Sequence, residues 1–213
     1  FSSNNVILEN NTFFINTTSN FCTNCRGYWF AGTNISLKNE KLVIYGNGRY
    51  QGEGTIISSD NLNISITNSN ITSYDSFDLF FGGNLPLNGG NWNLTNVSYT
   101  DKNYSANKGA LQIWYYAKIN AINATGDVIS NANVTLRDSY GVYLFSENTN
   151  AQGYTSQYLL KQLNITNNSD LSLNPYSVTI NASGYNYYTG SINISYSGVY
   201  NIVLNLPDTT PPN

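Results

Sequence analysis

The chain has 213 residues, of which 10% are charged and 14% are aromatic, and its formal net charge is −3. Disordered segments are usually poor in aromatic residues and rich in net charge, so this composition predicts a folded protein with a real core. The nine Lys and Arg residues are scattered singly, which excludes the basic stripe that nucleic-acid binding requires. No apolar run approaches the ~20 residues of a membrane-spanning helix. We therefore expect no nucleic-acid partner and no transmembrane segment.

Histidine is absent from the sequence. Its absence excludes imidazole as a general base, His ligands to a metal and His as an axial haem ligand. We expect no catalytic residue, no metal site and no cofactor other than covalent N-glycans. The sequence starts at Phe1 without a basic and apolar leader, so we expect a secreted or cell-surface chain whose signal peptide has been removed.

A repeat of 28 to 29 residues runs through the first half of the sequence. Four segments fit the pattern Asn-φ-x-φ-x-Asn-x-x-φ, where φ is apolar, and they start at Asn5, Asn34, Asn63 and Asn91. The alternation predicts half-buried strands. The second Asn of the pattern suits a sharp corner, because Asn tolerates the left-handed conformation. We predict that these corner residues form a structural Asn ladder: Asn10, Asn39, Asn68 and Asn96.

This Asn corner resembles that of the right-handed parallel β-helix in the pectate-lyase-like and copper-periplasmic-repeat families. The resemblance covers residues 5 to about 108. It implies that residues 1–110 form a short parallel β-helix solenoid. A leucine-rich repeat is excluded, because it needs a helical return segment and these returns are rich in Gly, Ser, Asn and β-branched residues.

The only two cysteines lie close together, as Cys22-Thr23-Asn24-Cys25. A small disulfide-closed loop between Cys22 and Cys25 is the simplest interpretation in a secreted protein, and free thiols are the alternative. A c-type haem would require His after the second Cys, where Arg26 stands instead.

From residue 111 onward, short alternating segments recur with turn signals between them, which is typical of a sandwich. The expected strands are 114–122, 132–138, 142–147, 155–161, 176–182, 190–196 and 199–206. The turn from Asn150 to Tyr154 and the stretch from Pro175 to Tyr185 are similar to parts of the carboxypeptidase-regulatory-like family. This resemblance implies an Ig-like antiparallel β-sandwich over residues 111–206, which serves as a spacer or platform. Residues 207–213 are interpreted as a Pro/Thr linker or tail.

Asparagine is the compositional outlier, with 37 Asn beside 42 Ser and Thr. Chance would place about seven Asn-x-Ser/Thr sequons in such a chain, whereas the sequence holds 14. Selection for N-glycosylation is one explanation, and the bias in composition is the other. Weak modification is expected at Asn10 and Asn96, which serve the corner. The predicted glycosylation sites are Asn16, Asn34, Asn63, Asn70, Asn93, Asn103, Asn123, Asn133, Asn164, Asn167, Asn181 and Asn193.

Together the two modules resemble those of archaeal and bacterial surface glycoproteins. The sequence predicts a structural subunit of an extracellular filament, sheath or surface layer, a homo-oligomer or polymer. Its contacts would be end-to-end or strand-mediated, because the ends of a repeat stack must be covered.

Two alternatives stay open. One is a module of a large surface adhesin that binds surface polysaccharide or cells through the aromatic clusters 28–30, 114–116 and 185–188, although such aromatics are more often core. The other is a polysaccharide-active enzyme, for which Asp75 and Asp78 would be the neighbouring acids or Ca²⁺ ligands.

Overall fold

The computed structural model describes residues 2–16, 28–45, 56–58, 63–73, 79–81, 90–99, 102–104, 109–166 and 169–207. Every regular element in these ranges is a strand, so the all-β class expected from the alternating patterns is confirmed. The chain divides into two compact units, residues 1–114 with 163–171, and residues 115–162 with 172–213. The predicted division into domains 1–110, 111–206 and 207–213 is not tested by these units and stays a prediction.

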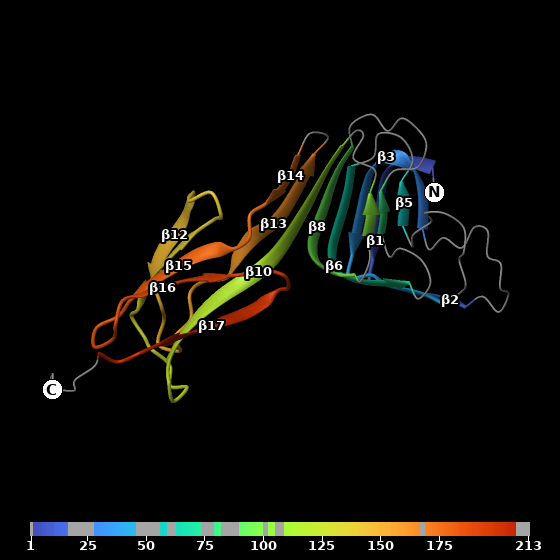
Figure 1. Cartoon of the computed structure of the whole chain (residues 1–213). Helices are drawn as coiled ribbons and strands as arrows, with labels where there is room; N and C mark the ends of the chain where they lie inside the picture. Colours follow the sequence, from blue (N-terminus) through green and yellow to red (C-terminus); the bar gives the residue numbers. More distant parts are fainter. Residues whose placement is uncertain are drawn as a thin grey trace. The chain divides into compact units, whose positions relative to one another are not determined.

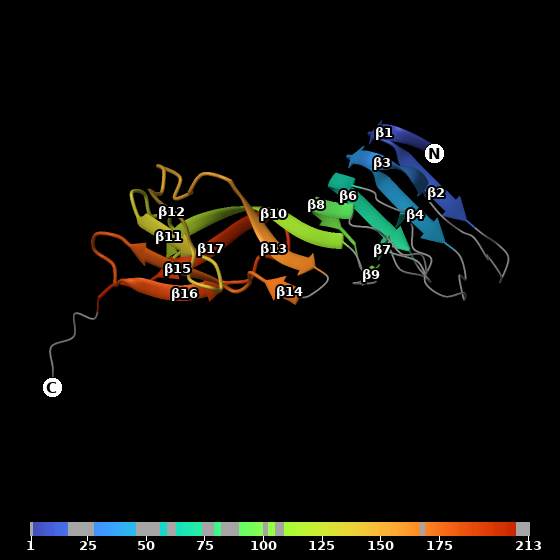
Figure 2. The ribbon, with the colours of Figure 1, turned by 90° about the horizontal axis from the view of Figure 1, so that it is seen from above.

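The first unit is built from parallel strands that stack one repeat upon the next. One ladder runs in the order β1–β3–β6–β8–β10, a second joins β2 to β4 and to the end of β6, and a third runs β3–β5–β7–β9 (Figures 1 and 2). Their bounds are β1 (Ser2–Glu9), β2 (Thr12–Asn16), β3 (Tyr28–Lys38), β4 (Lys41–Tyr45), β5 (Ile56–Ser58), β6 (Asn63–Ser73), β7 (Leu79–Phe81), β8 (Gly90–Ser98), β9 (Lys102–Tyr104) and β10 (Gly109–Asn123).

The register of the ladder equals the length of the sequence repeat. Asn34 pairs with Asn5 on one side and with Asn63 on the other. Equivalent apolar positions therefore stack in columns, and in the middle of the stack these columns are buried: Ile35, Ile64 and Trp92 in one, Leu37, Ile66 and Leu94 in the next. Burial of these columns is the main stabilising contribution to the unit.

The expectation of a pectate-lyase-like or copper-periplasmic-repeat β-helix over residues 1–110 is wrong. In the described part of the chain the parallel strands form open ladders, and no closed coil of rungs is present. The sheet instead continues from β10 into β13 (Tyr158–Thr166) and β14 (Ser169–Ser172). The physical reason is that an Asn corner at constant spacing requires only that successive strands stack in register. It does not require that the chain close around them.

The second unit contains a four-stranded antiparallel sheet in the order β12–β11–β15–β16 (Figure 2). These strands are β11 (Asn133–Arg137), β12 (Tyr143–Asn148), β15 (Tyr176–Asn181) and β16 (Tyr188–Ile192). Strands β11 and β15 alternate buried with more exposed side chains, and their buried residues are Val134, Leu136, Val178 and Ile180.

The other strands of the second unit correct the expectation of a purely antiparallel sandwich. The end of β10 pairs in parallel with β17 (Gly198–Leu204), with Ala117 opposite Gly198 and Asn123 opposite Leu204. Alternation in a sequence shows which face of a strand is buried. It does not show the direction in which two strands distant in sequence will pair.

Candidate functional site

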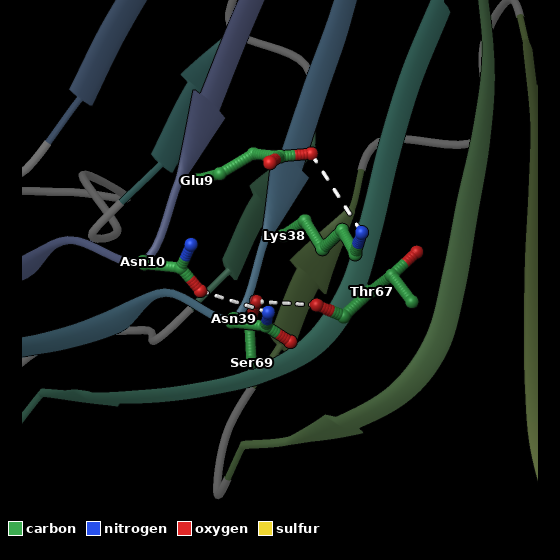
Figure 3. Close-up of polar contacts among 6 residues, drawn as sticks. All are labelled: Glu9, Asn10, Lys38, Asn39, Thr67 and Ser69. Atoms are coloured by element: carbon green, nitrogen blue, oxygen red, sulfur yellow. Dashed lines mark hydrogen bonds and ion pairs between the residues drawn. The ribbon is translucent and has the colours of Figure 1, made fainter.

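The corners of the first unit are formed by the four asparagines of the predicted ladder. Asn10, Asn39, Asn68 and Asn96 have φ angles of 61°, 55°, 50° and 53°, in the left-handed region that Asn tolerates better than most residues. The amide nitrogen (Nδ2) of Asn39 donates to Oδ1 of Asn10 at 2.9 Å (Figure 3), and that of Asn96 donates to Oδ1 of Asn68 at 2.8 Å. The backbone N–H of Asn39 donates to the carbonyl of Thr67 at 2.9 Å. The side chains thus tie successive repeats together at the turn.

A second asparagine column, which sequence analysis did not identify, stands at the start of the repeat. Nδ2 of Asn34 donates to Oδ1 of Asn5 at 3.2 Å, and Nδ2 of Asn63 donates to Oδ1 of Asn34 at 3.1 Å. Oδ1 of Asn63 accepts the backbone N–H of Asn91 at 3.1 Å. The signal was present, because this Asn recurs as regularly as the corner Asn.

Beside the corner, a buried polar column links three repeats. Glu40 is 2% exposed, and its Oε1 accepts the backbone N–H of Asn11 at 3.2 Å and Nδ2 of Asn11 at 2.9 Å. Its own N–H donates to Oγ of Ser69 at 3.0 Å, and that hydroxyl donates to the carbonyl of Thr67. A buried carboxylate is tolerated where such bonds satisfy it. The sequence analysis weighed acids as catalytic groups or Ca²⁺ ligands and therefore missed this structural role.

The outer surface of this region carries an ion pair and the charge of Lys41, whose Nζ lies 5.7 Å from the centroid of the Phe14 ring. Lys38 and Glu9, on neighbouring strands, form an ion pair with 3.7 Å between Nζ and Oε1 (Figure 3). Both side chains are about half exposed, so water screens the pair and it contributes little stability.

The interior columns of the first unit end at a partly exposed layer, which we call the β1–β2 end. It comprises Val6, Leu8 and Phe13 in the columns and Ile7 and Phe14 next to them. Phe13 occupies the same column as Leu42 and Ile71. Leu42 and Ile71 are 0% exposed, whereas Phe13 is 39% exposed. Val6 and Leu8 are half-buried. Among described strands, β1 pairs only with β3, and β2 only with β4. The other edge of each of these two strands has no partner among the described strands.

The predicted glycosylation sites differ in exposure. Asn34, Asn63, Asn70, Asn133, Asn181 and Asn193 are exposed, and Asn93, Asn123 and Asn164 are half-buried. Side chains outside the described part of the structure are those of Asn16, Asn103 and Asn167. The predicted disulfide between Cys22 and Cys25 and the acid pair Asp75 and Asp78 also lie outside the described residues. Of the aromatic clusters, Tyr115 is buried and Tyr187 is exposed.

Chemistry-bearing side chains are sparse in the described parts of both units. Over these ranges, no three His, Cys, Asp or Glu residues come together as metal ligands would. The described ranges also contain no helix of the length and apolarity needed to cross a membrane. The observed arrangement of side chains is thus one of stacking columns and an open end.

No family model matches the sequence, and no curated protein is a significant match. Solved structures similar to the chain include a catechol 1,2-dioxygenase variant from Acinetobacter radioresistens, at 12% identity and a TM-score of 0.34, covering 46% of this chain and 54% of that one. The Bacillus anthracis TIE protein matches at 14% identity and a TM-score of 0.33, covering 52% of this chain and 20% of that one.

A variant of the shaft pilin SpaA from Lactobacillus rhamnosus GG matches at 10% identity and a TM-score of 0.33, covering 54% of each chain. The matched part spans 54% or less of each of these three proteins. Likenesses of this size assign no family. The resemblances to the pectate-lyase-like, copper-periplasmic-repeat and carboxypeptidase-regulatory-like families, and through them to archaeal and bacterial surface glycoproteins, are therefore corrected: no family model supports them.

Proposed function

We propose that the chain is a non-catalytic structural subunit of an extracellular, N-glycosylated surface assembly, such as a filament, sheath or surface layer. In this assembly a second copy of the chain covers the β1–β2 end. The observation that carries the proposal is the exposure of Phe13 in a column whose other members, Leu42 and Ile71, are fully buried.

The physical reason for a cover is that the β1–β2 end combines two unfavourable features. Core side chains there remain in contact with water, and each apolar group would gain free energy on burial. The free edge of β1 also offers a row of backbone N–H and C=O groups that another strand can pair with. A third feature of the β1–β2 end is the side-chain amide of Asn10. Its Oδ1 accepts a hydrogen bond from Asn39, but its Nδ2 has no acceptor among the described residues.

A second copy of the chain can supply the cover that this end requires. The cover must bring a strand with apolar side chains on its inner face and an amide oxygen near Asn10. The β1 strand of a two-fold-related copy would lie antiparallel to β1 and keep Val6 and Leu8 on the inner side. Glu9 on β1 and Lys38 on β3 neutralise one another, and a further charge beside this end is Lys41, whose Nζ lies 5.7 Å from the centroid of the Phe14 ring.

Sedimentation over a concentration series tests this proposal, with Phe13→Asp as the disruptive variant. Phe13→Asp should weaken self-association by at least about 30-fold, because a charge at a packed apolar centre removes a hot spot. Val203→Asp is the matched control, since Val203 is an exposed valine on β17 of the second unit, and it should associate as the wild type does.

Circular dichroism and urea unfolding establish whether Phe13→Asp is folded. If wild-type protein stays monomeric at high concentration, or if folded Phe13→Asp associates as tightly as wild type, the proposal is wrong. Electron microscopy of the native material would then separate filament, sheath and layer.

A second candidate is a module of a larger surface adhesin that binds polysaccharide. It is favoured by three exposed tyrosines of the second unit, Tyr140, Tyr187 and Tyr196, because tyrosine rings can stack on sugars. Retention of the monomer on polysaccharide columns, lost in Tyr187→Ala, would support this candidate over self-assembly.

A further inference from the structure

The described sequons differ in the hydrogen bonds and the burial of their asparagine side chains. A glycan is joined through Nδ2 of asparagine, so a nitrogen already bonded to a neighbouring strand is poorly placed to receive one. Asn34 donates through Nδ2 to Asn5 and accepts from Asn63. Asn34 and Asn63 also stand on paired strands, about 4.8 Å apart, which leaves little room for two adjacent sugars.

In two sequons of the second unit, the asparagine Nδ2 likewise donates a hydrogen bond to a neighbouring side chain. Nδ2 of Asn123 donates to Oδ2 of Asp127 at 3.1 Å, while its Oδ1 accepts the hydroxyl of Thr125 at 2.7 Å. Nδ2 of Asn133 donates to Oδ1 of Asn148 at 3.0 Å. In each case the amide is part of the local structure.

Three further sequons are restricted in other ways. Oδ1 of Asn164 is buried, and Asn93 is half-buried in β8. Oδ1 of Asn70 accepts the hydroxyl of Thr72, which belongs to the same sequon, at 3.2 Å. Recognition of Asn70 would have to compete with this internal hydrogen bond.

Asn181 and Asn193 differ from all of these. Both side chains are exposed, and no described residue hydrogen-bonds their amides. In each sequon the middle residue, Ala182 or Ile194, is buried. Alternation therefore turns the Asn and the Ser of each sequon outward together, on the side that an enzyme can reach.

Local hydrogen bonds and a turn hold the Asn and Ser side chains of both sequons on the outward face. Asn174 accepts the N–H of Ile194 through Oδ1 and donates through Nδ2 to its carbonyl, both at 2.9 Å. After Asn181 the chain turns through Gly184, whose φ is 84°. The two sequons are thus fixed at opposite ends of the β15–β16 pair.

Between the two sites runs a band of hydroxyl groups, which we call the hydroxyl strip: Ser177, Thr179, Thr189 and Ser191. The register places Ser177 opposite Ser191 and Thr179 opposite Thr189, all on the outward face of the sheet. Within the described residues these hydroxyls have no side-chain partner. The distance from Asn181 to Asn193 is about 20 Å along the strands, so sugars at both sites would not collide.

We propose that Asn181 and Asn193 are the N-glycosylated residues of this sheet, and that their glycans lie over the hydroxyl strip. The inference rests on the extracellular location in the proposed function. The co-reactant is an oligosaccharide ester of a phosphate carrier, supplied with its transferase. Nδ2 forms a bond to the anomeric carbon, the bond from that carbon to the phosphate oxygen breaks, the phosphate leaves with the electron pair, and one amide proton passes to solvent. The hydroxyls of the strip can donate hydrogen bonds to the hydroxyls of a sugar and accept them, and the neighbouring strand β11 places Arg137 opposite Ser177.

Glycopeptide mass mapping of the full chain, secreted from cells that carry out N-glycosylation, tests the assignment. Peptides containing Asn181 and Asn193 should carry saccharide, and those containing Asn34 and Asn63 should be bare. Asn181→Gln and Asn193→Gln should each remove the mass of one glycan. Asn133→Gln, the matched control on the same sheet, should leave the mass unchanged. Equal occupancy at Asn34 and Asn63, or bare Asn181 and Asn193, would overturn the proposal.

A second measurement tests whether the glycans lie over the strip. In the double variant Thr179→Val and Thr189→Val, an endoglycosidase should release the glycans several-fold faster than from wild type, because the sugars lose their hydrogen-bond partners. An unchanged release rate, or retention of free neutral polysaccharide by the bare strip, would contradict this part.

Sedimentation of the same samples separates this inference from the assembly proposal. Bare Asn181 and Asn193 in a chain that self-associates would overturn only the glycan assignment. Glycosylated chain that stays monomeric would overturn only the assembly.

Discussion

At the scale of single residues, the corner asparagine meets two demands at once. Asn39 adopts a φ of 55° and donates through its amide to Asn10. Glycine would meet the first demand without the second, and alanine would meet neither. The left-handed conformation costs most residues roughly 1–2 kcal/mol, while an exposed hydrogen bond contributes about 0.5–1.5 kcal/mol.

Substitutions at Asn39 can separate these two contributions. Asn39→Gly should lower the free energy of unfolding by about 1 kcal/mol, because only the hydrogen bond of the side-chain amide is lost. Asn39→Ala should lower it by about 2–3 kcal/mol, since the backbone is then strained as well. Urea unfolding measures both values. An alanine variant as stable as the glycine variant would show that the backbone conformation contributes nothing here.

Residue-scale prediction from the sequence succeeded where a pattern had a known conformational cause. The repeat and the turn preference of Asn together picked out Asn10 and Asn39, which the structure places at left-handed corners. The Asn5 column was missed because an asparagine within a strand carries no such conformational signal. Glu40 was missed because a buried carboxylate cannot be told from a solvated one without knowing that Asn11 lies beside it.

At the scale of elements, the alternation of apolar and polar residues predicted the positions of strands well but predicted their pairing poorly. The expected strands 132–138 and 176–182 correspond closely to β11 and β15. The parallel pairing of β10 with β17 was not foreseen, because their residues lie about 80 positions apart, as Ala117 and Gly198 do. Nothing local in either strand specifies the partner or its direction.

The stability of the second unit should depend on alkaline pH through Tyr158, which takes part in an aromatic contact between β12 and β13. Phe145 and Tyr158 stack with ring centroids 3.8 Å apart. Burial, together with the hydrogen bond and negative charge of Glu147, raises the pKa of Tyr158 to about 12, from about 10 in an unfolded chain. The folded state thus retains a proton that the unfolded state releases, so this contribution is present below pH 10 and is lost between about pH 10 and 12.

Tyr158→Phe tests this dependence, because it keeps the ring stack and removes the titrating hydroxyl. The free energy of unfolding, measured in urea from pH 8 to 12, should fall less steeply above pH 10 in the variant than in wild type. Tyr187→Phe, at an exposed tyrosine, serves as the control and should keep the wild-type slope. Parallel curves for wild type and Tyr158→Phe would contradict the assignment.

At the scale of the whole molecule, the sequence could not reveal which layer of the stack is uncovered. Phe13 and Leu42 occupy the same place in the repeat and look equivalent in sequence, yet only Phe13 is exposed. Their difference arises from what lies next to them in space. The division into units has the same origin, since residues 163–171 belong with the first unit although they are distant from it in sequence.

Three described strands, β10, β13 and β14, run from one unit into the other, and this continuity predicts coupled unfolding. The boundary after residue 114 falls inside β10, and the boundary after residue 162 falls inside β13. A strand that frays in one unit loses its extended backbone at the boundary and weakens the ladder beyond it. We therefore expect a single cooperative transition, although two units of this size could in principle unfold separately.

Hydrogen exchange on a core variant of the first unit decides between coupled and separate unfolding. Leu42 is fully buried, so Leu42→Ala should lower the free energy of unfolding by about 2–5 kcal/mol. If the units are coupled, the amides of β15 in the second unit should lose the same amount of protection as those of β6 in the first. Val178→Ala, at a fully buried position of β15, is the reciprocal control and should lower protection in β6. Loss of protection confined to the unit that carries the substitution would show that β10 and β13 do not transmit stability across the boundary.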